Sequence, residues 1–543
     1  MGNVWVMFAA LCAMMGSANT SIAEPISLAP VAMPAISTVE VRYQSYNIEM
    51  AEVVGGNFRK PYDQKSGKES NKKSLTPKPA SAPSASIPGI APLQIGQGTM
   101  FQLRPPINLT DTRLRQLLAA LGPAYVRVSG TWANSVYFHD ADTPAPAVPP
   151  KGFNSVLSRS QWKNVIDFAR DVDAKIMTSF AISPGVRNAA GIWTTDQAQA
   201  LLTYTKSVGG EIAAVEFFNE PNLPTEEGAP PRYSAENFAR DFAIFRRFMR
   251  AEAPGVLIAG PGTVGEGDAL SISSTIMPLL TTVDIFAATA PPRFNIFSYH
   301  SYPSVSIRCA LTGQGGQTEE KEALSDEWLA RPDQIHDFYL HLRDRFERRK
   351  PIWVTETAAE TANAACGGSP WAGTFLDSFR YLDQLGRRAK NEVKVIFHNT
   401  LASSDYGLLD QDTFLPRPNY WAALLWRKLM GTTVLDAGRS WPGLKLYAHC
   451  LPGHSGGVTI LAINNSKTQT QSIELAAASD RYTLSNPRLD DIDVELNGKV
   501  LELQANEELP ALQGEHVPAG YVELLPASIT FLAVAEAGNS DCQ

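Results

Sequence analysis

Short apolar runs alternate with amphipathic segments over most of the chain, from about residue 41 to residue 431. Eight runs have the length and the β-branched or aromatic content of buried strands, and they occupy residues 41–53, 124–130, 175–183, 213–220, 256–262, 294–301, 351–357 and 393–399. Segments with helical spacing lie between most of them, for example 111–122, 160–172, 195–208, 235–255 and 333–349. Such an α/β alternation implies parallel strands with right-handed crossovers, and eight units close naturally into a (β/α)8 TIM barrel. An open, doubly wound sheet is the alternative, but no Gly-rich phosphate loop follows an early strand.

The pattern changes towards the C-terminus. From about residue 433 the chain has short alternating runs separated by Gly, Asn and Pro, which is typical of an antiparallel β-sandwich. We therefore predict a barrel domain over 24–432 and a sandwich domain over 433–543, to which a strand from about 30–42 could be added. A segment rich in Lys, Ser and Pro at about 58–98 is interpreted as a loop insertion in the barrel.

The first 23 residues predict export. They contain no charged side chain, an apolar stretch from Val4 to Met15 and small residues up to Ala23, the organisation of a cleaved secretory signal. The mature protein is therefore expected to be secreted or periplasmic. No later run offers the roughly 20 apolar positions of a membrane helix, so we expect no stable membrane insertion. The 47 Lys and Arg residues against 55 Asp and Glu residues give a net charge of −8, which argues against nucleic acid as a partner.

Polar residues gather where several predicted barrel strands end. The fourth strand ends in Asn219 and Glu220, the sixth leads into His300 and Tyr302, and the seventh ends near Glu356. In a barrel these ends form the mouth where catalytic groups lie. Strands four and seven lie on opposite sides of the ring, so Glu220 and Glu356 should face one another across the pocket. Paired carboxylates are typical of glycoside hydrolysis, and a separation of about 5 to 5.5 Å gives retention of configuration through a covalent intermediate.

The surroundings of the two glutamates predict different roles. Glu220 follows Asn219, whose amide could hold a sugar 2-hydroxyl, whereas Glu356 emerges from an apolar strand and could accept a hydrogen bond from a tyrosine. We therefore predict that Glu220 is the general acid/base, with a raised pKa, and that Glu356 is the ionised nucleophile. Two carboxylates suffice for this reaction, so no metal and no organic cofactor are expected.

Each of these motifs has a more ordinary interpretation when it stands alone. Asn-Glu-Pro is a common turn or helix-start signal, and only its joint occurrence with Glu356 favours catalysis. His300 could equally be a histidine with a structural partner at a strand end. Glu216 and Glu360 are alternative carboxylates, and strand alternation places Glu216 on the same side as Glu220, as a support inside the barrel.

Several longer motifs resemble one family. The stretches YVRVSGTWANSVYF, VEFFNEPN, WVTETAAETANAACGG and DYGLLDQDTFLPRPNYWAALLWRKLMG are similar to the heparanase and β-glucuronidase group, glycoside hydrolase family 79. The resemblance implies a retaining barrel enzyme in which the two glutamates have the roles given above. It also implies that Tyr302 donates a hydrogen bond to the nucleophile and that His300 lines the sugar site. The uronic acid carboxylate would be held by the uronate grip, which we define as the backbone of Gly367 and Gly368 together with Tyr406.

Four cysteines remain after the signal. Their wide spacing fits disulfides in an exported protein better than a zinc site. The family resemblance implies a bond between Cys450 and Cys542, which leaves Cys309 and Cys366 to each other.

The predicted function is that of a retaining glycoside hydrolase that cleaves β-glucuronic acid linkages in an oligosaccharide, a polysaccharide or a glycoside. Endo cleavage of a heparan-type polysaccharide competes with exo removal of a terminal glucuronate. A non-catalytic carbohydrate-binding relative is a second hypothesis, although a binding protein has no need for both glutamates. A barrel glycosidase for a neutral sugar is a third, and such an enzyme has no need for the uronate grip.

Overall fold

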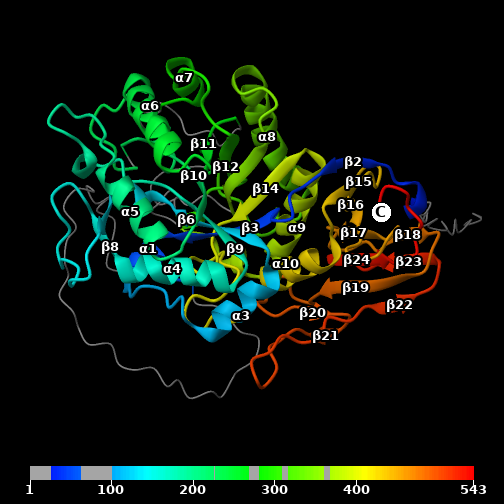
Figure 1. Ribbon diagram of the computed structural model, residues 1–543. Coiled ribbons are helices and arrows are strands. Elements are labelled where there is room, and N and C mark those ends of the chain that lie inside the picture. The colour runs from blue at the N-terminus through cyan, green and yellow to red at the C-terminus, as the bar shows by residue number, and fades with distance from the viewer. Residues whose placement is uncertain (1–25, 63–100, 226, 268–279, 309–315, 360–366) are drawn as a thin grey trace, which may run out of the picture.

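The computed structural model describes residues 26–62, 101–225, 227–267, 280–308, 316–359 and 367–543. Over these residues the chain forms a barrel of strands with helices around it, and β-sheets that stand beside the barrel at the C-terminal end (Figure 1). The predicted signal at 1–23 lies outside the described residues.

Eight strands close the barrel in chain order, and every neighbouring pair is parallel. They are β3 (Gln44–Glu49), β6 (Ala124–Ser129), β9 (Ala174–Thr178), β10 (Ile212–Val215), β11 (Leu257–Thr263), β12 (Ile296–Ser301), β13 (Ile352–Thr357) and β14 (Val393–His398). All eight lie within or overlap the predicted strands, so the predicted (β/α)8 fold is confirmed. Inside the barrel, seven of the strands contribute to a buried apolar cluster, which includes Tyr125, Trp353 and Phe397.

Helices surround the barrel strands (Figure 1). The main ones are α3 (Thr112–Leu121), α4 (Arg159–Asp171), α5 (Asp196–Ser207), α6 (Ala235–Glu252), α7 (Thr282–Ala288), α8 (Asp326–Phe346), α9 (Phe375–Lys390) and α10 (Pro418–Leu429). The sequence signals that start them are local. At α4, for example, the Ser158 hydroxyl accepts the backbone N–H of Gln161, whose side chain accepts the N–H of Ser158 in return, a complete capping box.

Some predicted boundaries are wrong. The strand predicted at 41–53 ends at Glu49, and α1 (Met50–Val54) follows at once. The cause is another capping box, in which the Glu52 carboxylate accepts the N–H of Glu49 at 2.8 Å. The strand predicted at 213–220 ends earlier, at Val215, so Asn219 and Glu220 belong to the loop that follows.

The C-terminal sheets form two layers around a second apolar core. The larger sheet contains β2 (Ala35–Thr38), β15 (Thr433–Leu435), β16 (Leu444–Cys450), β17 (Val458–Asn464), β24 (Ser528–Val534), β19 (Ser479–Ser485), β20 (Glu495–Leu496), β21 (Lys499–Val500) and β22 (Glu515–Val517). The smaller sheet contains β1 (Ile26–Leu28), β18 (Gln471–Leu475) and β23 (Gly520–Leu524). Side chains such as Leu28, Ile460, Ile473 and Leu532 fill the space between them. The predicted β-sandwich is thus confirmed, and the N-terminal segment contributes β1 and β2 to it.

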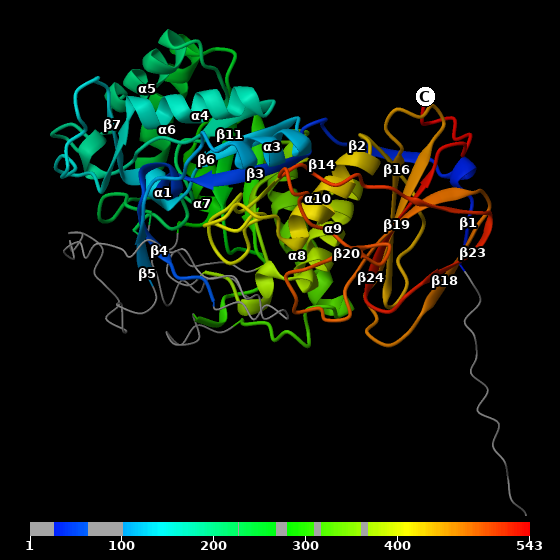
Figure 2. The ribbon, with the colours of Figure 1, turned by 90° about the horizontal axis from the view of Figure 1, so that it is seen from below.

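The sandwich packs directly against the barrel. Figure 2 shows its strands at one end of the molecule, beside α9 and α10. The Tyr447 hydroxyl of β16 donates to Asp383 of α9 at 2.5 Å, and Lys445 contacts Asp326 at the start of α8 at 2.6 Å. These buried polar contacts fix the orientation of the sheets relative to the barrel helices.

The predicted Cys450–Cys542 disulfide is confirmed, and it ties β16 to the last residues of the chain. Cys309 and Cys366 lie outside the described residues, so their pairing stays a prediction. In the part of the chain that the structure describes, no helix is long and apolar enough to cross a membrane.

Two further strands flank the segment interpreted as a loop insertion. The strands β4 (Gly56–Arg59) and β5 (Phe101–Arg104) pair antiparallel with each other. The insertion predicted at about 58–98 therefore begins inside a strand, and residues 63–100 lie outside the described part.

Candidate active site

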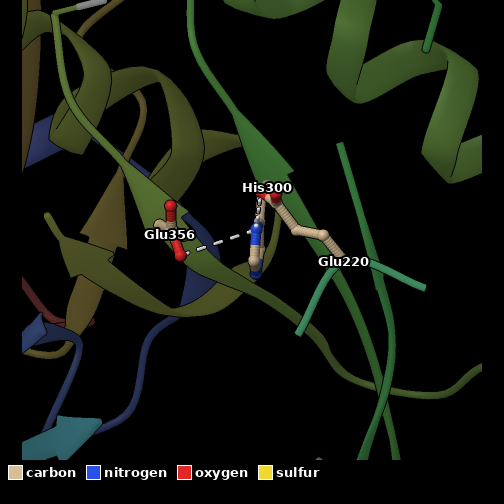
Figure 3. A group of neighbouring side chains, drawn as sticks. All are labelled: Glu220, His300 and Glu356. Carbon is tan, nitrogen blue, oxygen red and sulfur yellow. Dashed lines mark hydrogen bonds and ion pairs between the residues drawn. The ribbon is translucent and has the colours of Figure 1, made fainter. Parts of the chain in front are cut away.

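Three side chains meet at the carboxyl ends of the barrel strands. Figure 3 shows Glu220, His300 and Glu356 pointing toward one another, with the imidazole between the two carboxylates. His300 Nδ1 lies 2.8 Å from Glu220 Oε1 and 3.6 Å from Glu356 Oε2. His300 is fully buried and bridges the two carboxylates, and its place in the sugar site stays a prediction.

Glu356 lies inside a barrel strand, directly after a shift in the register between that strand and β12. It belongs to β13, and its register partner on β12 is His300. Arg127 Nη1 donates to Glu356 Oε2 at 3.0 Å, while the Tyr302 hydroxyl donates to Oε1. The Asn399 amide lies 3.4 Å from the same Oε1 atom. The hydrogen bond from Tyr302, which the family resemblance implies, is therefore present.

Glu220 has a different kind of support. It lies in the loop after β10, with a φ of 47°, a left-handed conformation that is uncommon for a residue other than glycine. His300 is the only side chain in the described part of the chain with a hydrogen bond to its carboxylate. The Asn219 amide, predicted to hold a sugar hydroxyl, is engaged by the protein: Oδ1 accepts from Arg127 at 2.6 Å and Nδ2 donates to Glu227 at 3.1 Å.

These surroundings move the two pKa values in opposite directions. Burial raises the pKa of Glu220 above its ordinary value, the negative charge of Glu356 adds to the effect, and the hydrogen bond to His300 only partly opposes it. Burial alone would also raise the pKa of Glu356, but His300, Arg127 and the Tyr302 hydroxyl together lower it below its ordinary value. Glu220 is thus suited to carry a proton at a pH at which Glu356 is ionised.

The spacing of the carboxylates favours one stereochemical course. An oxygen of Glu220, an oxygen of Glu356 and a ring nitrogen of His300 all lie within 4.8 Å of one another. Carboxyl groups about 5 Å apart suit a retaining glycosidase, whereas inverting enzymes need roughly 6.5 to 9.5 Å to admit a water molecule. The same donor atoms could also hold a divalent metal ion, but the proton transfer and nucleophilic attack of glycoside hydrolysis need only the two carboxyl groups.

Arg127 is central to the site, although it was not predicted from the sequence. This fully buried side chain of β6 donates to Glu216 through Nε at 3.1 Å and through Nη2 at 2.6 Å, in addition to its contacts with Glu356 and Asn219. Burial tends to lower the pKa of Arg127, but Glu216 and Glu356 more than offset this and raise it. An arginine in the middle of the apolar run AYVRVS was the available signal, since a buried charge requires a partner.

The alternative carboxylates differ from the central pair. Glu216 is fully buried and its Oε1 is occupied by Arg127 and by Ser129, so it supports the site from inside the barrel. Glu360 lies outside the described residues. Glu49, at the end of β3, is a further acidic group that the sequence reading missed, and burial followed by the charge of Glu356 raises its pKa well above the ordinary range.

The residues predicted to form the uronate grip lie together. Gly367 has a φ of 73°, which a side chain would disfavour. A Cβ atom at Gly368 would lie 3.0 Å from Cδ1 of Tyr406, so the glycine allows the loop after β13 to touch the loop after β14. Tyr406 is buried, and its backbone carbonyl accepts a hydrogen bond from His398 at 2.8 Å. The structure therefore brings together the three positions that the family resemblance implies, and their role in binding stays a prediction.

Comparisons with known proteins bear on the family and the fold of the chain, and no family model matches it. The chain is 33% identical over 504 residues to heparanase from Gallus gallus, with 80% of this chain and 90% of that protein covered. It is 24% identical over 481 residues to hyaluronoglucuronidase from Hirudo nipponia, covering 80% and 92%. A crystal structure of a 4-O-α-L-rhamnosyl-β-D-glucuronidase from Fusarium oxysporum 12S matches 94% of this chain and 99% of its own with a TM-score of 0.59. At 13% identity, that likeness shows a shared fold.

Proposed function

The chain belongs to the heparanase and β-glucuronidase family of glycoside hydrolases, family 79, and we propose that it hydrolyses β-glucuronic acid linkages with retention of configuration. The observation that carries the proposal is the pair Glu220 and Glu356, whose oxygens approach within 4.8 Å and whose pKa values are shifted in opposite directions.

The reaction follows from these two environments. In the first step the Glu356 carboxylate attacks the anomeric carbon, and the bond to the leaving oxygen breaks as Glu220 protonates that oxygen. A covalent glycosyl-enzyme results. In the second step Glu220, now ionised, takes a proton from water while the water oxygen attacks the same carbon and releases Glu356. Both glutamates end in their starting states.

Arg127 and Tyr302 support the nucleophile through this cycle. Their donors lie on the two different oxygens of Glu356, so they stabilise its negative charge and orient the carboxylate toward the pocket. His300 links the two groups, because its Nδ1 atom lies 2.8 Å from Glu220 Oε1 and 3.6 Å from Glu356 Oε2.

The substrate class rests on the uronate grip. Backbone N–H groups in a glycine turn can approach an anion closely and stabilise it by charge-assisted hydrogen bonds. Gly367 and Gly368 provide such a turn beside Tyr406, on the loop that follows the strand of Glu356. We therefore place the glucuronate carboxylate at these residues, in a glucuronic acid-containing oligosaccharide, polysaccharide or glycoside. Secretion, through the predicted signal at 1–23, belongs to the same proposal.

The test is hydrolysis of an aryl β-glucuronide and of the matching aryl β-glucoside by the mature protein, with the anomer of the first-formed product identified by NMR. We expect cleavage of the glucuronide, little cleavage of the glucoside, and a β-configured first product. Equal rates on both substrates would contradict the uronate grip and favour a neutral-sugar glycosidase. An α-configured first product would contradict retention, and binding of glucuronides without any turnover would favour a carbohydrate-binding protein.

Tyr406→Phe sharpens this test of substrate class. Removing the hydroxyl should raise KM for the glucuronide and leave the residual activity on the glucoside unchanged, because only the glucuronide carries the carboxylate. Tyr420→Phe is a matched control, since Tyr420 is a buried tyrosine whose hydroxyl donates to Leu117 on the outer side of the barrel. An equal loss on both substrates in Tyr406→Phe would place the glucuronate carboxylate elsewhere.

A further inference from the structure

The loop that carries Glu220 also contains a buried carboxyl group that the reaction described above does not use. Glu227 is 2% exposed. Its Oε2 atom accepts hydrogen bonds from Asn134 at 2.7 Å and from Asn219 at 3.1 Å, and its Oε1 atom lies 2.9 Å from the Thr131 hydroxyl. Across the described ranges of the chain, no Lys, Arg or His side chain forms an ion pair with it.

These contacts fix the residue that precedes Glu220. The Asn219 backbone N–H donates to Asn134 Oδ1 at 2.9 Å, and its carbonyl accepts from Asn134 Nδ2 at 3.0 Å. The Asn219 side chain is held by Arg127 on one side and by Glu227 on the other. All four polar groups of Asn219 are therefore occupied, and the peptide plane that leads into Glu220 cannot rotate without breaking several buried hydrogen bonds.

This support explains why Glu220 can keep an unusual backbone conformation. A left-handed φ costs free energy for a residue with a Cβ atom, and it persists only where the surroundings enforce it. The turn after Glu220 contributes as well, since Leu223 donates to the Glu220 carbonyl at 2.9 Å and Glu227 donates to the Leu223 carbonyl at 3.0 Å. Both the side chain and the backbone N–H of Glu227 thus hold the segment that aims Glu220 at the pocket.

We propose that Glu227 is a positioning residue for the acid/base Glu220 and that it does this as a neutral carboxylic acid. The inference rests on the proposed function. In the neutral acid the carbonyl oxygen Oε2 accepts the two amide N–H groups, and a hydroxyl at Oε1 takes over the donor role in the 2.9 Å contact with Thr131 Oγ1. An ionised Glu227 would instead add a negative charge near the ionised Glu356 without an ion-pair partner of its own.

The electrostatic surroundings agree with this assignment. Burial, and then the negative charge of Glu220, raise the pKa of Glu227 well above its ordinary value, and Glu356 adds to the shift. The hydrogen bonds that Asn219 and Thr131 can donate to the ionised form of Glu227 oppose this rise in pKa without cancelling it.

The experiment compares wild type, Glu227→Gln and Glu227→Ala on phenyl β-glucuronide and on dinitrophenyl β-glucuronide, with and without azide. The amide of Gln reproduces the neutral acid, with one acceptor oxygen and one donor toward Thr131. Glu227→Gln should therefore keep kcat within about twofold of wild type and leave both limbs of the pH profile in place. Glu227→Ala should lower kcat on the phenyl substrate by at least about tenfold, with a smaller change in KM, because the phenolate needs a well-placed acid. The dinitrophenolate leaves without protonation, so the first step on that substrate does not need the acid. Azide attacks the glycosyl-enzyme without a base, so azide should restore turnover of the dinitrophenyl substrate in Glu227→Ala.

A control variant separates positioning from loss of stability. Glu266 is a partly buried glutamate outside the site, and its carboxylate accepts the N–H of Thr282 at 3.1 Å at the start of α7. Glu266→Ala should lower the thermal unfolding temperature without changing the ratio of rates on the two substrates and without azide rescue.

Three results would overturn the inference alone. If Glu227→Gln lost as much activity as Glu227→Ala, the neutral form would not be sufficient and the negative charge of Glu227 would be needed. A shift of the basic limb of the pH profile in Glu227→Gln would show the same. An equal loss on both substrates in Glu227→Ala, with no azide rescue, would indicate a purely structural role. A wild type that cleaves neither glucuronide would instead overturn the proposed function, and this inference with it.

Discussion

The two glutamates at the centre of the site belong to contrasting parts of the barrel. Glu356 lies inside β13, between the parallel strands β12 and β14, and pairs in register with His300 of β12. Glu220 lies beyond the end of β10, in a left-handed conformation held by hydrogen bonds to the residue before it. One carboxylate is thus placed by the sheet itself and the other by a buried polar network in a loop.

The contrast extends to the charges around them. Glu356 receives hydrogen bonds from Arg127 and Tyr302 and lies close to His300, whereas Glu220 has only His300 as a side-chain partner within the described segments. Identical carboxyl groups therefore differ in protonation because their neighbours differ, which is the usual basis for assigning an acid and a nucleophile in a glycosidase. The predictions below test whether this division of roles is correct.

Glu356→Gln should have the largest effect. An amide cannot attack the anomeric carbon, so kcat on an aryl β-glucuronide should fall by at least about 10⁴-fold. The fold should be retained, since Arg127 keeps its two hydrogen bonds to Glu216, and circular dichroism can check this. Substantial remaining activity would assign the nucleophile to another carboxylate.

Glu220→Gln should have a smaller effect that depends on the substrate. Loss of the general acid typically costs about 10²- to 10⁴-fold, so phenyl β-glucuronide should be cleaved poorly. The first step on dinitrophenyl β-glucuronide should be nearly as fast as in wild type, because that leaving group needs no proton. The measurement is a burst of dinitrophenolate that precedes slow steady-state turnover. An equal loss of the rate of the first step on both substrates would contradict the acid role.

The same contrast explains which parts of the molecule the sequence could reveal. The eight barrel strands follow from local apolar runs, and the carboxyl ends of parallel strands must meet at one mouth. Glu356 and His300 could therefore be placed from the chain alone. The Cys450–Cys542 bond and the proximity of Gly368 to Tyr406 came from the family resemblance instead.

Long-range polar contacts and backbone exceptions could not be predicted in this way. Glu227 and Glu49 read as ordinary acidic residues in the sequence, and only the folded chain brings them beside the site. The left-handed Glu220 has no sequence signal, since it depends on Asn134, which lies in the loop after a different strand. Local propensity likewise failed at 50–53, where a capping box starts α1 inside an apolar run.

The pH dependence of kcat/KM should show both pKa shifts. Glu356 must be ionised, and its pKa is lowered, so activity should persist below the ordinary pKa of a glutamate and fall only at more acidic pH. Glu220 must be protonated, and its pKa is raised, so activity should fall on the basic side at a pH above that ordinary value. On each limb kcat/KM should fall by about tenfold per pH unit. Loss of the basic limb in Glu220→Gln would assign that limb to the acid/base, whereas an unchanged profile would contradict the assignment.

Tyr302→Phe should have the smallest effect and tests the nucleophile side alone. The Tyr302 hydroxyl donates to Glu356 Oε1 and lowers the pKa of that carboxyl group, so its removal should raise the pKa and move the acidic limb to higher pH. A hydrogen bond to a charged group is worth about 1.5 to 3 kcal/mol, but Asn399 Nδ2 remains 3.4 Å from Oε1 and can compensate in part, so we expect kcat to fall by only about tenfold. Tyr299→Phe is the matched control on β12, the strand that leads into Tyr302, because the Tyr299 hydroxyl lies 2.9 Å from His336 of α8 on the outer side of the barrel. That variant should change thermal stability and leave both limbs in place. If Tyr302→Phe moved the basic limb instead of the acidic one, the hydroxyl would be acting on Glu220. The assignment of Glu220 as the protonated acid and Glu356 as the ionised nucleophile would then be wrong.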